Sequence, residues 1–495
     1  MRINPILAID GYKTSHREQY PAGTSRIYSN FTPRGNRFFT SPLADNRLVF
    51  FGLQGFLRWF MVDLFNEAFF ARPEAEIVAE YQQLMDSYLG KGCIDAEHIR
   101  ALHRLGYLPL EIKSLDEGSK VPMQVPVLTI TNTVDEFFWL VNYLESVMSA
   151  ELWKASTNAT IAHHYRQLCQ RWSTLTCDSD AHLDFQCHDF SLRGMSGLQD
   201  AAQAGAAHLL SFTGTDSVPS ILYLRQYYTP PENYFIAGSI PATEHSVMCM
   251  GEEQGEIATF RRLITELYPQ GFVSVVSDTW DYWKVLTEYS RELKAEIMAR
   301  EGRLVFRPDS GDPVEILCGT GLDTDRDPAR TPQQKGSVEV LWEIFGGTVN
   351  EKGYKVLDGH VGLIYGDSIT LERANQILAR LEAKGFASSN VVFGVGSYTY
   401  QYNTRDTFGF AMKATWGEVN GVGREIFKQP KTDSGLKKSA HGLLRVERDA
   451  AGDYRLLDRQ SRAQEQGGEL KTRFLDGKLM NMEDLPTLRQ RLAGW

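Results

Sequence analysis

Seven short apolar runs between residues 185 and 397 each end in residues that could bind or activate a substrate. The runs read FQCHDF, SFTGTD, FIAGSIPATEH, FVSVVSD, RLVFRPDSG, LIYGDS and VVFGVGS. Their ends carry carboxylates, a cation, a histidine and glycines: Asp189, Asp216, Glu244, His245, Asp278, Arg307, Asp309, Gly366, Asp367, Gly396 and Ser397. Helical patterns follow most of these ends, which is typical of a barrel of parallel strands with its chemistry at their carboxyl ends.

The string FRPDSGDP at residues 306–313 is the most specific of these ends. Arg307 offers a planar set of N–H donors for an oxyanion or a ring carbonyl, and Pro308 fixes the backbone beside it. Asp309 could accept hydrogen bonds from sugar hydroxyls or hold Mg²⁺ through water. The alternative interpretation is an ion pair between Arg307 and Asp309 that only stabilises the loop.

The last two runs, YGDS and FGVGS, place glycine where a strand should end. Glycine lets backbone N–H groups approach an anion without a side chain in the way. The last two strand ends of such barrels often form a phosphate site. We therefore expect Gly366, Asp367, Gly396 and Ser397 near a sugar phosphate, although tight turns alone would also need glycine.

The remaining candidates each have a structural alternative. His245 could accept a proton, attack a phosphoryl group or bind phosphate when charged. Asp216 and Asp278 could bind substrate or simply cap the next helix. Arg193 could belong to a buried ion pair, and Phe190 could stack on a flat ring or belong to the core.

A set of cations outside the predicted barrel points to a polyphosphate ligand, with a solvated loop as the alternative. It comprises Arg34, Arg405, Lys413, Lys428, Lys437 and Lys438. With the glycine ends and the aromatic residues, these cations suggest a phosphorylated sugar and a flat base. Transfer of a phosphoribosyl group fits this inventory, because carboxylates would stabilise the cation-like sugar while Mg²⁺, Arg and Lys neutralise the departing pyrophosphate.

The elements that must position these residues fall into two groups. Residues 48–104 have a helical pattern, residues 107–133 read as strands and residues 135–177 return to helix. The segment LERANQILARLEAKG predicts a helix capped by Thr370 and Gly385 that covers a parallel strand. After residue 400 the alternation stops, so we expect residues 1–150 and 398–495 to form one α+β domain, with the barrel at 151–397 inserted between them.

The composition limits the class of protein. A chain of 495 residues is too long for one ordinary core, and its net charge of −10 argues against broad nucleic-acid binding. The six cysteines are scattered, which indicates reduced core thiols. No stretch is long and apolar enough to cross a bilayer, and the first apolar run ends at Asp10 too early for a signal peptide. These features predict a cytoplasmic protein without membrane contact.

An ordered set of motifs along nearly the whole chain resembles the nicotinamide phosphoribosyltransferases, a family of NAD-salvage enzymes. The motifs are DGYKTSHREQYP, LPLEIK, HDFSLRG, GTDS, PATEHS, SVVSD, RPDSG, GDS, TRD and IFK. The resemblance implies a type II phosphoribosyltransferase-like α/β fold, an irregular TIM-type β/α barrel with an α+β domain. It also implies a homodimer with active sites at the subunit interface, Mg²⁺, and ATP as a coupled co-substrate.

The resemblance further implies roles for individual residues. Phe190 and Tyr12 of the partner subunit would enclose the pyridine ring, and Asp216 would accept from the carboxamide. That carboxylate would favour nicotinamide over nicotinate, because nicotinate would place two anions together. Arg193 and Arg307 would hold the carboxamide oxygen or the pyrophosphate.

The same resemblance assigns the sugar and phosphate groups. Ribose and phosphate would contact Arg307, Pro308, Asp309, Gly366, Asp367, Gly396, Ser397 and Arg405. Diphosphate would contact Arg34, Arg193, His245, Arg307, Lys413 and Lys428. The implied catalytic residues are His245, Asp309 and Asp278, with Asp278 and Asp309 also as metal ligands and His245 phosphorylated by ATP.

Two departures from the family pattern bear on the donor site. Gly396-Ser397-Tyr398 replaces a run of glycines, so Tyr398 must point away from the sugar, and Thr243 replaces an alanine beside Glu244. Three alternatives remain: a nicotinate phosphoribosyltransferase, a barrel glycosidase with paired carboxylates, and a non-catalytic binding protein on this scaffold.

Overall fold

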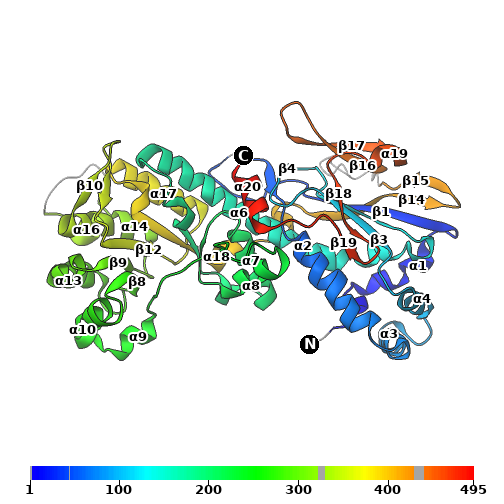
Figure 1. Ribbon diagram of the computed structural model, residues 1–495, viewed down its shortest axis with the longest axis horizontal. Coiled ribbons are helices and arrows are strands. Elements are labelled where there is room, and N and C mark those ends of the chain that lie inside the picture. The colour runs from blue at the N-terminus through cyan, green and yellow to red at the C-terminus, as the bar shows by residue number, and fades with distance from the viewer. Residues whose placement is uncertain (1–2, 44, 322–328, 428–439, 495) are drawn as a thin grey trace.

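The computed structural model describes residues 3–43, 45–321, 329–427 and 440–494. The molecule is elongated, with an antiparallel sheet at one end and a curled parallel sheet at the other (Figure 1). The long helix α6 (Glu145–Thr176) runs between the two ends. Each end has its own hydrophobic core, as the length of the chain predicts.

The antiparallel sheet combines strands from both ends of the chain. Its order is β15-β14-β1-β5-β3-β18-β19. The strands are β1 (Thr24–Thr32), β3 (Leu110–Ser114), β5 (Leu128–Asn132), β14 (Ala411–Val419), β15 (Val422–Glu425), β18 (Lys471–Leu475) and β19 (Lys478–Leu479). The predicted domain boundaries at residues 150 and 398 remain a prediction, but the sheet they require is present.

A buried helical segment packs under this sheet. It begins with α2 (Leu53–Phe56) and continues through the π-helical turns Leu57–Leu64 and Asn66–Phe70. The prediction of helix from residue 48 was wrong at its start, because Arg47–Val49 forms strand β2 and pairs with β4 (Lys120–Pro122). The buried carboxylate of Glu117 then accepts from the N–H groups of Gly52 and Gln54 at 2.7 and 2.6 Å, which fixes the start of the helix.

The parallel sheet has the order β7-β6-β13-β12-β9-β8. Its strands are β6 (Cys187–Asp189), β7 (Gly214–Thr215), β8 (Gln270–Val276), β9 (Glu301–Arg307), β12 (Val361–Tyr365) and β13 (Val391–Val395). Single bridges join Gly238 to Gly214 and Ala242 to Ser274. Six of the seven predicted strands are therefore present, and the run FIAGSIPATEH instead crosses from β7 to β8 as an irregular segment.

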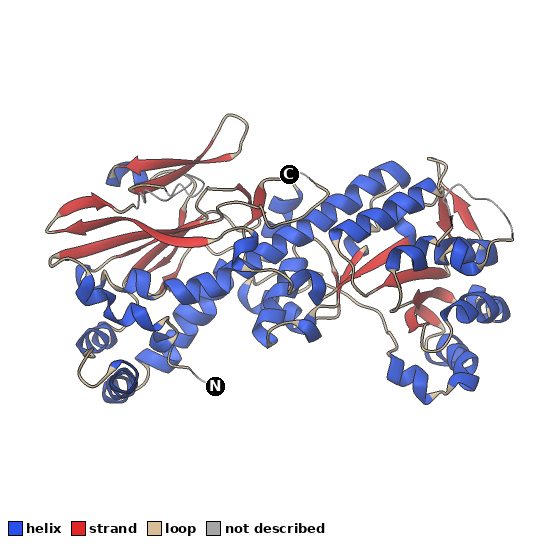
Figure 2. Cartoon of the chain, turned by 180° about the vertical axis from the view of Figure 1, so that it is seen from behind, coloured by secondary structure: helices blue, strands red, loops and turns tan. Residues whose placement is uncertain are grey.

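Helices cover the outside of the curled sheet, as Figure 2 shows from behind. Helix α17 (Leu371–Ala383) confirms the sequence prediction, because Thr370 caps it by accepting from the N–H of Arg373 at 3.2 Å. The other barrel helices are α7 (Leu198–His208), α8 (Val218–Tyr227), α9 (His245–Met250), α10 (Glu256–Arg262), α11 (Tyr282–Lys284), α12 (Ser290–Glu292), α13 (Lys294–Met298), α14 (Pro313–Cys318), α15 (Pro332–Lys335), α16 (Ser337–Phe345) and α18 (Ser397–Tyr400).

The remaining elements complete the two ends. Helices α1 (His16–Gln19), α3 (Glu74–Leu89), α4 (Glu97–Leu105), α5 (Leu140–Tyr143) and α19 (Arg462–Glu465) belong to the end with the antiparallel sheet. Two hairpins are formed by β10 (Gly347–Val349) with β11 (Lys355–Leu357), and by β16 (Leu443–Arg448) with β17 (Tyr454–Gln460). The last helix, α20 (Leu485–Ala493), shares a core cluster with Phe51 and Ala206. None of the described helices combines the length and the apolar character that crossing a membrane requires.

Candidate active site in the curled sheet

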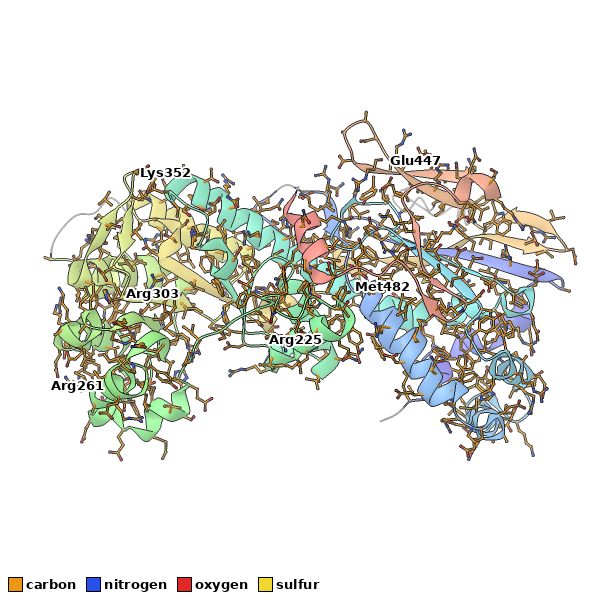
Figure 3. All side chains as sticks on the ribbon, in the orientation of Figure 1. Arg225, Arg261, Arg303, Lys352, Glu447 and Met482 are labelled. Carbon is orange, nitrogen blue, oxygen red and sulfur yellow. The ribbon has the colours of Figure 1, made fainter. Side chains whose placement is uncertain are left out.

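A cavity of about 510 Å³ lies within the curled sheet. His188, Phe190, Asp216 and Arg307 line it at the carboxyl ends of the strands, as the sequence predicts for the last three. Arg303 lines it nearer the amino end of β9, within the barrel end of the molecule (Figure 3). The cavity therefore extends along the strands and is large enough for a pyridine ring and more.

Phe190 lies against the backbone where β12 and β13 end. A Cβ atom at Gly394 would come within 2.5 Å of the Phe190 ring and of the Gly366 Cα atom. A Cβ atom at Gly366 would come within 3.2 Å of the same ring. Glycine at these positions thus makes room for Phe190, and one face of a flat ligand can stack there.

Asp216 is held by two side chains in this cavity. Its Oδ1 lies 2.9 Å from His188 Nε2 and accepts from the Ser239 hydroxyl at 2.5 Å. Burial raises the pKa of Asp216, but the bonds from His188 and Ser239 outweigh it and the pKa is lowered. The side chain is an ionised acceptor that remains 45% exposed to the cavity.

Arg307 ends strand β9 beside the cavity. Its Nη2 donates to the Thr243 carbonyl at 2.8 Å, which ties β9 to the irregular segment. Its Nε is buried and has no hydrogen-bond partner among the described residues. A buried donor without a partner is energetically unfavourable, so a hydrogen bond from Arg307 Nε to a ligand oxygen would be favourable.

His245, Asp278 and Asp309 form a second group at the same edge of the sheet. Asp278 Oδ1 lies 3.2 Å from His245 Nε2, and Oδ2 accepts from the Asp309 N–H at 3.0 Å and the Ser310 hydroxyl at 2.5 Å. The Asp278 side chain is only 5% exposed, whereas that of His245 is 47% exposed. Asp278 therefore orients an accessible histidine and the loop that carries Asp309, which in turn lies near Gly366.

The strand end that carries Gly396 differs from the other strand ends that carry glycine. Gly396 has a φ of −104°, and a Cβ atom there would meet no described protein atom within 4 Å. Its neighbour Ser397 packs so closely against Gly194 that a Cβ there would lie 2.1 Å from the Ser397 hydroxyl. Tyr398 stacks on Tyr402 with rings 5.4 Å apart and is exposed, which leaves the backbone at Gly396 open.

Several predicted site residues lie outside this cavity. Tyr12 is 60% exposed next to α1, while Arg34 and Lys413 line a small hollow on β1 and β14. All three belong to the end of the molecule opposite the curled sheet (Figure 1). Arg193 and Arg405 are exposed, on the short helices Leu192–Gly194 and Arg405–Thr407. Of the predicted cations, Lys428, Lys437 and Lys438 lie outside the described residues, and so does most of the 431–442 loop.

The sequence analysis did not single out the two side chains that contact Asp216 in the cavity, His188 and Ser239. The signal for His188 was available, because it lies two residues before Phe190 and alternate residues of a strand share a face. Ser239 had no such signal, since its segment is not a regular strand. Asp189, between His188 and Phe190, is instead buried and accepts from the Ser191 N–H and the Thr215 hydroxyl.

Comparison with known proteins identifies the family. The model described as "Nicotinate phosphoribosyltransferase (NAPRTase) family" matches residues 185–478, which include Phe190, Asp216 and Arg307. The chain belongs to this phosphoribosyltransferase family. A second model, "Nicotinamide phosphoribosyltransferase, N-terminal domain", matches residues 4–110 of this phosphoribosyltransferase.

Relatives of this phosphoribosyltransferase cover nearly its full length. A nicotinamide phosphoribosyltransferase of Acinetobacter baylyi is 58% identical, covering 99% of this chain and 97% of its own. Another from Mycoplasma pneumoniae is 36% identical, covering 87% and 93%. The solved structure of human nicotinic acid phosphoribosyltransferase has a TM-score of 0.55 at 17% identity, covering 98% and 92%. The sequence prediction of a type II phosphoribosyltransferase fold is confirmed.

Proposed function

We propose that this protein transfers the phosphoribosyl group of 5-phosphoribosyl 1-pyrophosphate to nicotinamide, giving nicotinamide mononucleotide and pyrophosphate in NAD salvage. The bacterial relatives that span nearly the whole chain carry the name nicotinamide phosphoribosyltransferase. The observation that carries the choice of pyridine is the ionised carboxylate of Asp216 in the cavity. A carboxylate accepts from the N–H₂ of a carboxamide and repels the carboxylate of nicotinate.

The pyridine would lie on the ring of Phe190, with its carboxamide N–H₂ on Asp216 and its oxygen near Arg307. Its ring nitrogen would attack C1 of the ribose, and the C1–O bond to pyrophosphate would break with its electron pair leaving on the pyrophosphate. The sugar becomes cation-like in this step, so carboxylates fixed near C1 lower the barrier. Asp309 is the best placed of these, because its loop is anchored on Asp278.

The sugar and its phosphates would occupy the edge of the sheet next to the pyridine. Asp309, Gly366 and Asp367 would hold the ribose hydroxyls, and the open backbone at Gly396 would receive the 5′-phosphate together with Ser397. This last assignment is supported by the space around Gly396, which no described protein atom fills. The pyrophosphate and phosphate would also meet the cations described by the sequence analysis, Arg193, Arg307, Arg405 and His245.

The donor set fits a Mg²⁺ ion that is held mainly by substrate. Asp278 has both carboxylate oxygens engaged by His245, Asp309 and Ser310. Asp309 is therefore the better candidate to hold Mg²⁺ directly, with phosphate oxygens and water as further ligands, which is the usual arrangement for this ion. When bound, the ion would neutralise charge on the departing pyrophosphate.

The active unit would be a homodimer. Tyr12 lies next to α1, and Arg34 and Lys413 line a hollow on β1 and β14. These elements lie at the end of the chain opposite the curled sheet, so a second subunit would have to bring these residues to the cavity. Exposed apolar side chains near the cavity edge support such an interface: Leu192, Leu198, Val218, Leu222, Tyr398 and Tyr402. A salvage enzyme that uses this donor would act in the cytoplasm.

ATP coupling would act through His245. Asp278 orients one ring nitrogen and leaves the side chain accessible for phosphorylation. Incubation with γ-labelled ATP should label the wild-type protein but not His245→Ala. Equal labelling of both proteins would exclude this role for His245.

The reaction itself is tested by product analysis. Purified protein is incubated with 5-phosphoribosyl 1-pyrophosphate and either nicotinamide or nicotinate, with and without ATP. We expect nicotinamide mononucleotide as the main product and a higher kcat/KM for nicotinamide. A preference for nicotinate would support the nicotinate phosphoribosyltransferase alternative, and turnover of neither pyridine would contradict the proposal.

A further inference from the structure

The two hydrogen bonds to Asp216 both reach the same oxygen. His188 Nε2 and the Ser239 hydroxyl approach Oδ1, at 2.9 and 2.5 Å. Among the described residues, no side chain or backbone N–H bonds to Oδ2. Because an ionised carboxylate can only accept, both partners donate, and His188 carries a hydrogen on Nε2. Oδ2 is thus the oxygen left for a ligand.

The ring of His188 has little freedom to turn away. Its side chain is 10% exposed, and a Cβ atom at Gly214 would lie only 2.8 Å from its Nδ1. On its other side the ring packs against Phe190, with centroids 4.9 Å apart. The strand β6 therefore holds both the stacking ring and the donor to Asp216 in fixed positions.

The other charged and titratable groups around His188 have partners other than Asp216. Asp189 on the same strand is buried and bonded to the Ser191 N–H and the Thr215 hydroxyl. Behind the strand, burial lowers the pKa of His208 to about 4, so that ring is neutral. Arg307 is a permanent cation that is tied to the Thr243 carbonyl.

We propose that His188 is a positioning residue that sets the pyridine selectivity of this site. By donating to Oδ1 it turns Oδ2 of Asp216 toward the carboxamide N–H₂. The negative charge of Asp216 opposes nicotinate. The inference rests on the proposed function and adds to it the residue that makes Asp216 selective.

Two substitutions test the N–H donor of His188. His188→Leu removes the donor, whereas His188→Gln keeps an N–H donor of similar reach. His103→Gln is the matched control, because His103 lies on α4 at the other end of the molecule and contacts the Arg72 carbonyl. The kcat/KM for nicotinamide and for nicotinate is measured for each protein.

We expect the ratio of the two kcat/KM values to fall about tenfold in His188→Leu, mainly through a higher KM for nicotinamide, since a hydrogen bond to a charged group is lost. His188→Gln should keep the ratio because it keeps the donor, and the control should match the wild type. An unchanged ratio in His188→Leu, or a ratio in His188→Gln as low as the one expected for His188→Leu, would overturn the proposal. If His188→Leu fails to fold, as judged by circular dichroism, the ratio of His188→Gln decides alone.

The outcome also distinguishes this inference from the function on which it rests. Wild-type protein that prefers nicotinamide, together with a His188→Leu variant that keeps its selectivity, would remove only the role of His188. Wild-type protein that turns over neither pyridine would remove the proposed function and this inference with it.

Discussion

At the scale of single residues, selectivity depends on which atom of Asp216 faces the ligand. In Asp216→Asn the amide oxygen should take the place of Oδ1, because His188 and Ser239 both donate there. The amide N–H₂ would then face the cavity, where it opposes a carboxamide N–H₂ and suits a carboxylate. We expect the nicotinamide-to-nicotinate ratio of kcat/KM to fall about a hundredfold, because the group that faces the ligand changes from a hydrogen-bond acceptor to a donor. Steady-state kinetics with both pyridines measures this ratio, and a ratio within a few-fold of wild type would contradict it.

The sequence identified Phe190, Asp216 and Arg307 because each follows an apolar run at a predicted strand end. It could not identify Ser239 as a donor to Asp216, since Ser239 lies on a segment whose course is set by bridges to β7 and β8. The sequence also could not distinguish a glycine that is required for packing within the protein from one that leaves space for a ligand. Gly394 makes room for Phe190, whereas Gly396 has no described neighbour that a side chain would strike.

At the scale of elements, this difference between two glycines at the end of β13 gives a matched pair of variants. Gly394→Ala would push a Cβ atom to 2.5 Å from the Gly366 Cα atom, so it should displace β12 and lower the melting temperature by several degrees. Gly396→Ala should keep the melting temperature and raise the KM for 5-phosphoribosyl 1-pyrophosphate about tenfold or more, because the methyl group would occupy space meant for phosphate. Thermal melts and donor titrations test both, and a normal donor KM in Gly396→Ala would contradict the phosphate assignment.

The junction between α6 and α7 should make stability depend on pH. Burial, followed by the charge of Asp200, raises the pKa of Glu151 to about 7. Because folding raises the pKa of this carboxyl, its protonated form favours the folded state. Its ionised form lowers the free energy of unfolding, and this loss grows as the pH rises from the pKa of the unfolded state toward 7 and above. Glu151→Gln should therefore stabilise the protein on the order of 2 kcal/mol at pH 8 and much less at pH 5. Urea unfolding at both values measures this, and equal gains at both would contradict it.

The course of the elements was predicted best where local patterns agree with tertiary packing. The stripe of α17 and the strands at 107–133 were predicted correctly because period and caps are readable in a single segment. The start of the buried helix was not predicted correctly, because the apolar run at residues 48–51 is compatible with both helix and strand. Pairing with β4 determines that a strand forms there. Long-range partners of this kind cannot be read from one segment.

At the scale of the whole molecule, the separation of Tyr12 from Phe190 predicts complementation between subunits. Tyr12→Ala and Asp216→Ala should each be nearly inactive as homodimers, because every site would lack one component. After mixing, unfolding and refolding together, heterodimers would contain one intact site, and we expect activity to return to about a quarter of wild type by random pairing. Activity that stays at the level of the single variants, with dimers seen by light scattering, would show that Tyr12 and Asp216 do not act across an interface.

The pairing of β1 with β14 also has a consequence for synthesis. Tyr28 pairs with Trp416, and this contact lies inside the antiparallel sheet, between its second and third strands. While the ribosome is still making the barrel, β1 has no β14 beside it and offers an unsatisfied edge to any other chain. This edge is covered only after β14 (Ala411–Val419) has been made, so premature termination should yield aggregates rather than a smaller folded enzyme.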